Sequence, residues 1–356
     1  MRKVLFGTAA LMVLAVAACG KPFAPPTASP MPEATRSPTP VPTPIRTPSA
    51  TDVTVPASID TTGSTDASTA LNDWLRTVPD GSTIVFPPDA VYRMDTGLVF
   101  TDRHGLVFEG NGATLKSNGT AGCSRDCSLF YLLERNTGIS VRNFNLVGNS
   151  PTPGVLNRAW EHASAITIIG GGDVEISQVT IRDVGGDGLT LSGGGVDTPD
   201  RVHFHDSRVI SSGRNGVAVI AGSNVTVEGV AFETVGYTVF DIEPNTSSQS
   251  ARNIRFVDNT AGTWDNSFLS AEGAPGSIVS GVTVSGNTVT GGSLRTAIAL
   301  ARRQNIVFTN NTSTVPARGP VLRFAYVDGL TVTGNVQPLT SGGLASIVGC
   351  TGVTYR

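Results

Sequence analysis

The fold is decided by four stretches that share one form: Ile254-Arg-Phe-Val-Asp-Asn259, Val282-Thr-Val-Ser-Gly-Asn287, Ile306-Val-Phe-Thr-Asn-Asn311 and Leu330-Thr-Val-Thr-Gly-Asn335. Each begins with two apolar residues that flank a single residue, and an asparagine follows three residues after the second. Such alternation is typical of a short β-strand with one buried face. Asparagines at one position of successive repeats predict a ladder of stacked side chains that bond to neighbouring backbones.

The same alternation recurs towards the N-terminus and sets a period. Apolar pairs begin at Ile139, Val174, Val202 and Val225, and a last partial one begins at Val353, so that successive intervals run from 23 to 35 residues. A period in this range is typical of a solenoid, in which each repeat adds one coil to a stack. Because the repeats are rich in Val, Thr and Gly, they predict an all-β right-handed parallel β-helix and not a leucine-rich repeat.

A short helix is predicted to cap the N-terminal end of this solenoid. Asp66 is placed to cap the helix, and apolar residues from Ala67 through Trp74 to Val78 recur at helical spacing before Gly81. We interpret Trp74 as a core residue, because it lies on this apolar stripe.

Composition supports this fold class and excludes one class of function. The chain has 356 residues, of which 41 are Gly and 15% are charged, whereas an average soluble domain has roughly 7% Gly and 25% charged residues. The formal net charge is −3. Nucleic-acid binding depends on a basic surface that neutralises phosphates, so we expect no nucleic-acid partner.

The first 57 residues predict export. A basic start precedes an apolar run that ends in Val16-Ala-Ala-Cys19, so residues 1–18 are interpreted as a bacterial lipoprotein signal, with lipid attached to Cys19. An ordinary signal peptide is the alternative. Residues 19–57, rich in Pro, Thr and Ser, predict an extended stalk, and residues 58–356 form the β-helix domain. We expect a monomer that is anchored by lipid to the cell envelope, with its domain outside the cytoplasm.

The cysteines of the domain are few. Cys123 and Cys127 are predicted to close a small local disulfide, as expected of a cysteine pair in an exported chain. Free thiols are one alternative. A metal site is another, but no third ligand follows at a suitable spacing. We expect Cys350 to be a small buried residue.

Three segments resemble the opening of the pectate-lyase/polygalacturonase-like β-helix superfamily: Ile59-Asp-Thr-Thr-Gly63, Pro79-Asp-Gly-Ser-Thr-Ile-Val-Phe-Pro87 and Phe108-Glu-Gly-Asn-Gly-Ala-Thr-Leu115. The resemblance covers nearly everything after the stalk. It implies the β-helix fold, and the superfamily contains glycoside hydrolases, polysaccharide lyases, epimerases and phage tailspikes. The chain has no Asp-Asp pair, no His-Gly after a Gly turn and no Arg-x-Lys, which are elements of the polygalacturonase pattern, and this argues against pectin hydrolysis.

A second strand in each coil is predicted to place a column of side chains on one outer face. Its triplets, such as Phe240-Asp-Ile242, have apolar residues at both ends, and these are expected to face the core. The middle residues then point outwards and stack on one another. The predicted column contains Thr190, Ala218, Asp241, Ser270, Ala299 and Arg323.

Acidic residues in and beside this column are the candidate catalysts. Asp241 and Glu243 lie on one strand, where acids are depleted, and should share a face about 6–7 Å apart. Glu272 on the adjacent coil should lie ~4.8 Å from Glu243, close enough to raise the pKa of one of the two. Asp187 is either a turn residue or catalytic, and His162 is either a proton shuttle or a loop residue.

Aromatic and charged residues gather at one corner of the coils. An insertion before Ile166 ends in Trp160-Glu161-His162, and other coils carry further such residues at the same corner. Exposed aromatic rings predict stacking on sugars, and arginines predict binding of acidic groups. The predicted substrate-binding residues are Trp160, Glu161, Arg214, Tyr237, Trp264, Asp265, Glu272, Arg295 and Arg323.

These patterns favour a hydrolase that acts on a polysaccharide. Hydrolysis with inversion uses one carboxylic acid on the leaving oxygen and one carboxylate on water, ~6.5–9.5 Å apart. We expect Asp241 to be the acid or the base, with Asp187 or Glu243 as its partner. This reaction needs no metal and no other cofactor.

Two alternatives remain open. A lyase or epimerase on uronic-acid chains would use Tyr237, His162 or Arg323 as base, and Asp241 and Glu243 could then hold Ca²⁺. The second alternative is a non-catalytic glycan-binding protein of the cell surface, because a rigid β-helix is also suited to displaying a binding surface.

Overall fold

The computed structural model describes residues 52–119, 127–193, 197–298 and 303–356. The predicted signal, Cys19 and the stalk up to residue 51 lie outside the described residues, as does Cys123. Cys127 is disulfide-bonded. Cys350 is a free cysteine and is half-buried, not fully buried as predicted. Its sulfur accepts a hydrogen bond from the backbone N–H of Val327 at 3.4 Å.

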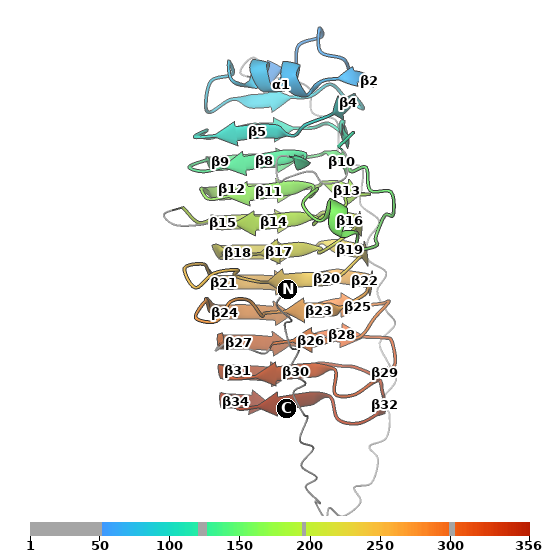
Figure 1. Cartoon of the computed structure of the whole chain (residues 1–356), viewed down its shortest axis with the longest axis vertical. Coiled ribbons are helices and arrows are strands. Elements are labelled where there is room, and N and C mark those ends of the chain that lie inside the picture. Colours follow the sequence, from blue (N-terminus) through green and yellow to red (C-terminus); the bar gives the residue numbers. More distant parts are fainter. Residues whose placement is uncertain (1–51, 120–126, 194–196, 299–302) are drawn as a thin grey trace, which may run out of the picture. The chain divides into compact units, whose positions relative to one another are not determined.

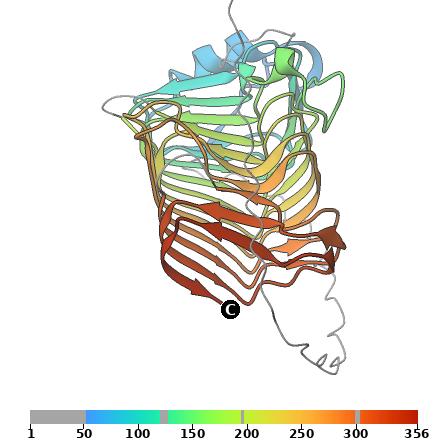
Figure 2. The same ribbon diagram turned by 60° about the horizontal axis from the view of Figure 1, so that its bottom comes forward.

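The described chain coils into three parallel sheets. Neighbouring strands of one sheet belong to successive coils, so the chain visits the other two sheets before it returns. Figures 1 and 2 show the strands stacked in chain order, from the blue N-terminal strands to the red C-terminal ones. The predicted parallel β-helix is therefore confirmed.

The first sheet contains the apolar pairs that the sequence repeats. Ile254 and Phe256 are fully buried and pair with Val282 and Val284 of the next coil. This sheet begins before the predicted domain boundary at residue 58, because its first strand pairs with Thr83–Val85. Its strands, in spatial order, are β1 (Asp52–Thr54), β3 (Thr83–Val85), β6 (Val107–Glu109), β9 (Thr137–Arg142), β12 (Gly172–Ser177), β15 (Asp200–His205), β18 (Gly222–Glu228), β21 (Ser250–Val257), β24 (Ile278–Ser285), β27 (Arg303–Thr309), β31 (Val327–Thr333) and β34 (Thr351–Tyr355).

The second and third sheets complete each coil. The second sheet contains β2 (Thr62–Asp66), β4 (Val91–Met94), β7 (Thr114–Ser117), β10 (Asn145–Val147), β13 (Thr180–Arg182), β16 (Arg208–Ser212), β19 (Ala231–Val235), β22 (Thr260–Trp264), β25 (Thr288–Val289) and β28 (Thr312–Ser313). The third contains β5 (Leu98–Thr101), β8 (Phe130–Leu133), β11 (Ile166–Ile169), β14 (Leu189–Ser192), β17 (Val217–Val219), β20 (Thr238–Ile242), β23 (Ser267–Ser270) and β26 (Thr296–Ala297). Two short pairs follow them, β29 (Ala317–Arg318) with β32 (Leu339–Ser341), and β30 (Leu322–Ala325) with β33 (Ala345–Val348).

A ladder of asparagines lines the corner between the first and second sheets. The Nδ2 group of Asn259 donates to Oδ1 of Asn287 at 3.0 Å, Asn287 donates to Asn311 at 2.8 Å, and Asn311 donates to Asn335 at 3.0 Å. The same Nδ2 group of each of the first three also donates to a backbone carbonyl of the preceding coil. The residue before each asparagine has positive φ, for example 53° at Asp258, and this tightens the corner. The predicted ladder is confirmed.

The ladder should contribute strongly to stability at its middle and weakly at its end. Asn287→Ala removes the side-chain partner of the buried Asn259 backbone N–H and of the Phe256 carbonyl in the preceding coil, so we expect the free energy of unfolding to fall by about 3 kcal/mol. Asn335→Ala is the matched control, because Asn335 is half-exposed at the ladder's last position. Urea unfolding of both variants measures the difference. A loss in Asn287→Ala no larger than that in the control contradicts the ladder's role.

The helix α1 (Ser68–Leu75) covers the N-terminal end of the coils (Figure 1). It is shorter than predicted, and Asp66 precedes it as the last residue of β2, where its carboxylate accepts from the backbone N–H of Ser68 at 3.0 Å. Leu71 and Leu75 are buried, and Trp74 packs partly buried against the core, as predicted. In the described ranges, no helix is long and apolar enough to cross a membrane.

Candidate functional site

The register of the third sheet aligns an outward column of side chains. Thr190, Ala218, Asp241 and Ser270 lie opposite one another on successive coils, as predicted. All four are buried, so the prediction that they face solvent is wrong. Ala299 was wrongly placed, since Ala297 pairs with Ser270 and residue 299 lies outside the described ranges. A polar residue, Thr296, fills the inward position there because its hydroxyl accepts from the Arg323 backbone N–H at 2.8 Å. Arg323 continues the column, since its neighbour Phe324 bridges to Ile298.

Asp241 is the most perturbed carboxyl of this column. Its side chain is only 6% exposed although it lies on the outward face. The pKa of Asp241 is raised to about 7, first by burial and then by the charges of Glu243 and Asp187. The charge of Arg214 and a hydrogen bond from Ser270 act in the opposite direction. Nδ2 of Asn215 donates to Oδ2 of Asp241 at 3.3 Å. Asp241 therefore titrates near neutral pH.

Asp187 is fully buried, and both of its carboxylate oxygens are occupied. Nε of Arg214 donates to Oδ1 at 2.7 Å, and Nη2 of Arg214 donates to Oδ2 at 2.5 Å. The backbone N–H of Asn215 and the hydroxyl of Thr190 complete the set at 3.0 and 2.8 Å. The pKa of Arg214 is raised, chiefly by the charge of Asp187. This bidentate pair fixes Arg214 close to Asp241 and occupies both carboxylate oxygens of Asp187.

Glu243 and Glu272 follow the third-sheet strands β20 and β23. Glu243 is exposed directly after β20, and its charge raises the pKa of Asp241. Glu272 is half-buried, and its pKa is raised first by burial and then by the charge of Glu243. Arg303 lowers the pKa of Glu272 in turn. The sequence therefore correctly predicted that these three acids interact.

The insertion before β11 packs its aromatic residue against the turn that contains Asp187. A 3-10 helix, η2 (Arg158–Trp160), precedes Glu161 and His162. A Cβ atom on Gly185 would lie 2.5 Å from Cβ of Trp160, so this glycine permits the contact. Trp160 is half-buried and not exposed as predicted, because it packs on this backbone. Glu161 pairs with Arg158 at 3.1 Å and raises the pKa of Arg214, whereas His162 is exposed.

The remaining predicted binding residues are divided between the core edge and the surface. Trp264 is half-buried because its ring packs 5.8 Å from that of Phe268, so the prediction of a freely exposed ring is wrong. Tyr237 is half-buried, and Asp265 is exposed. Arg295 and Arg323 are exposed and line one hollow of about 360 Å³.

Three contributors were not in the predicted site. Asn215 bridges Asp187 and Asp241, Ser270 bonds to Asp241, and Arg318 lines the same hollow as Arg295 and Arg323. The only signal for Asn215 is its place beside Arg214. Ser270 stood in the column without an assigned role, and Arg318 lies in a strand too short to show a period.

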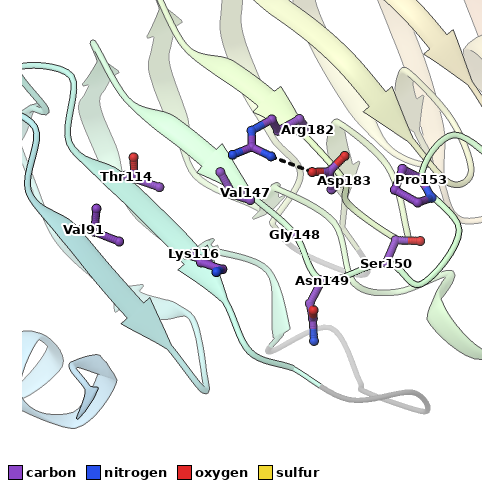
Figure 3. A pocket seen from close by; sticks show the side chains of 10 residues that line it. All are labelled: Val91, Thr114, Lys116, Val147, Gly148, Asn149, Ser150, Pro153, Arg182 and Asp183. Carbon is purple, nitrogen blue, oxygen red and sulfur yellow. Dashed lines mark hydrogen bonds and ion pairs between the residues drawn. The ribbon is translucent and has the colours of Figure 1, made fainter. Parts of the chain in front are cut away.

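A second hollow of about 460 Å³ lies over the second sheet (Figure 3). It is lined by β-strand residues such as Thr114 and Lys116 and by the start of the insertion at Asn149. Its arginine, Arg182, is paired with Asp183 at 2.8 Å. None of the predicted site residues lines it. Within the described ranges, no group of three or more His, Cys, Asp or Glu residues is arranged to hold a metal ion.

Solved structures with a similar fold include proteins of different kinds. The catalytic unit of the GH87 α-1,3-glucanase from Streptomyces thermodiastaticus is 11% identical (TM-score 0.44; 88% of this chain, 70% of that one). The endo-xylogalacturonan hydrolase from Aspergillus tubingensis is 14% identical (0.42; 85% and 92%). PfbA, a surface adhesin of Streptococcus pneumoniae, is 10% identical (0.39; 83% and 89%). At these identities the likeness concerns the fold alone.

The curated proteins contain no sequence match to this chain. The model of one family, described as the right handed beta helix region, matches residues 105–336. This match agrees with the three parallel sheets and with the handedness predicted from the repeat. The chain therefore belongs to the right-handed β-helix family.

Proposed function

We propose that the protein is a glycoside hydrolase that acts on a polysaccharide, with Asp241 as its general acid. One observation carries the proposal: the nearly buried Asp241, whose pKa is raised to about 7, lies on the outward face of the third sheet beside two other acids. A general acid works best when its pKa lies near the working pH. Strongly perturbed pKa values cluster at functional sites.

Glu243 is the partner that fits this chemistry. It follows Asp241 by two residues, so the two side chains leave the strand about 6–7 Å apart, at the lower end of the range for inverting hydrolysis. Glu243 is exposed and can take a proton from water, while Asp241 gives its proton to the leaving sugar oxygen. The proton of Asp241 ends on the freed hydroxyl, and the rest of the water molecule becomes the new anomeric hydroxyl. Glu243 then releases its proton to solvent, and Asp241 regains one from solvent, so that no net proton is consumed.

Arg214 and Asp187 would act through Asp241 and not on the sugar. Their ion pair is buried and places a fixed positive charge beside Asp241. That charge limits the rise in the pKa of Asp241. We therefore interpret Asp187 as a positioning residue.

The test is cleavage of a panel of neutral and acidic polysaccharides by the full chain. We expect new reducing ends without unsaturated-uronate absorbance, and Glu243→Gln should lower kcat by about 10²- to 10⁴-fold. Glu228→Gln is the matched control, because Glu228 is an exposed glutamate of the first sheet.

The outcomes separate the alternatives. Unsaturated ends would identify a lyase and overturn the hydrolase. Retention of a glycan without cleavage across the whole panel would identify a binding protein. Equal activity of Glu243→Gln and the control would remove Glu243 from the mechanism.

A further inference from the structure

Three arginines converge on one hollow near the C-terminal end of the third sheet. Arg295 precedes β26, Arg318 ends β29, and Arg323 lies in β30. Together with Ser293, Ala317, Pro320 and Val321 they line a space of about 360 Å³. Nε of Arg323 donates to the carbonyl of Pro320 at 3.4 Å. The lining therefore combines three arginines and one serine with three apolar residues.

These three charges lack the partners that other arginines have. Arg93, Arg142 and Arg182 each pair with a carboxylate at 2.8–2.9 Å. No ion pair joins Arg295, Arg318 or Arg323 to a described carboxylate, and no Asp or Glu is among the residues that line the hollow. Like charges in one concave space repel one another and raise the local potential. A bound anion would relieve this repulsion and could accept the planar, paired hydrogen bonds of a guanidinium.

The hollow is in line with the candidate catalytic acid. Asp241 pairs with Ser270, Ser270 with Ala297, and Ala297 lies opposite Arg323 because their following residues form a bridge. Three strand steps of about 4.8 Å place Arg323 about 14 Å along the stack from Asp241. An extended polymer lying along this sheet would reach both places.

We propose that this arginine pocket is a subsite for an anionic substituent, a carboxylate or a sulfate, of the glycan bound at Asp241. The inference rests on the proposed function for its substrate and names that substrate as an acidic polysaccharide. The anion occupies the pocket a few sugars away from the bond that is cleaved. It contributes affinity and the position of the chain and takes no part in the proton transfers.

The experiment measures binding, independently of cleavage, by calorimetry at low and high salt. The probes are a polyuronate, the same polymer after reduction of its carboxyl groups to neutral alcohols, and a sulfated dextran. Arg318→Gln combined with Arg323→Gln is compared with Arg252→Gln combined with Arg255→Gln, which removes the same charge from exposed positions of β21 in the first sheet. We expect the pocket variant to bind an anionic probe about tenfold or more weakly than the control variant.

Each outcome has a meaning. Loss of affinity for the polyuronate alone identifies a carboxylate, and loss for the sulfated dextran alone identifies a sulfate. Equal affinity of the two variants for both anionic probes would overturn the proposed anion subsite. Failure of the unaltered chain to bind either anionic probe more tightly than the neutral polymer would overturn it as well. Binding that depends on these arginines, without any cleavage, would support the anion subsite and contradict the proposed hydrolase activity. Cleavage of a neutral polymer by both variants would support the hydrolase activity and contradict the anion subsite.

Discussion

Asp241→Asn is expected to lower kcat by about 10²- to 10⁴-fold and, in the same variant, to make the folded chain more stable at pH 8 than the unaltered chain. The two effects have one cause. The site keeps a carboxyl group in a nearly buried position where its ionised form is disfavoured. An amide of the same size cannot donate a catalytic proton, but it also never carries the unfavourable charge.

The sign of the stability effect follows from the pKa values. The pKa of Asp241 is about 7 in the folded chain and about 3.9 in an unfolded chain. The folded state therefore binds more protons between these values, and the free energy of unfolding falls as the pH rises from about 4 to about 7. Between pH 5 and pH 8 this loss is on the order of 2 kcal/mol. The Asp241→Asn variant has no ionisable group at this position, so its free energy of unfolding does not show this loss.

Urea unfolding at pH 5 and pH 8, together with a pH profile of kcat, measures both effects. Activity of the unaltered chain should fall as the pH rises through about 7, because the general acid loses its proton. Asp258→Asn, an exposed acid of a turn, is the control and should change neither quantity. A stability difference between Asp241→Asn and the unaltered chain that is the same at both pH values would contradict the buried, protonated carboxyl.

The fold could be predicted because its signals are local. The apolar pair, the one-residue corner and the asparagine lie within six residues of each other, as in Val282–Asn287, and four successive coils repeat them. The outward column could also be predicted, because a strand alternates its side chains strictly. The prediction of this column failed at Ala299, because Ala297 occupies the outward position there. The neighbouring inward position is filled by Thr296, which bonds to the Arg323 backbone, and not by the apolar residue that usually marks an inward position.

The site was harder to predict, because its decisive contacts join different coils. Arg214 follows Asp187 by 27 residues, and nothing in that spacing indicates that its guanidinium takes up both carboxylate oxygens. The sequence therefore left Asp187 open as a turn residue or a catalyst. Trp264 was misjudged for a similar reason, since its packing on Phe268 depends on how the second sheet turns into the third.

Asp187→Ala should be the most destabilising single substitution in the site. It leaves the Arg214 guanidinium, whose side chain is 19% exposed, without its counter-charge and removes two further hydrogen bonds. Removing one partner of a buried ion pair typically costs about 3–5 kcal/mol. Glu233→Ala is the matched control, because it breaks the surface pair with Arg208, for which a loss of about 0–1 kcal/mol is expected.

A double-mutant cycle separates this pair from a general disturbance of the turn. If Arg214 is destabilising only because its charge is unpaired, then Asp187→Ala combined with Arg214→Leu should be more stable than Asp187→Ala alone. Asp187→Asn gives a second readout that simple unfolding would not produce. It removes a charge that raises the pKa of Asp241 while Arg214 still lowers it, so the alkaline limit of activity should move to lower pH. An unchanged limit in a folded Asp187→Asn variant would mean that Asp187 supports the turn but does not tune the acid.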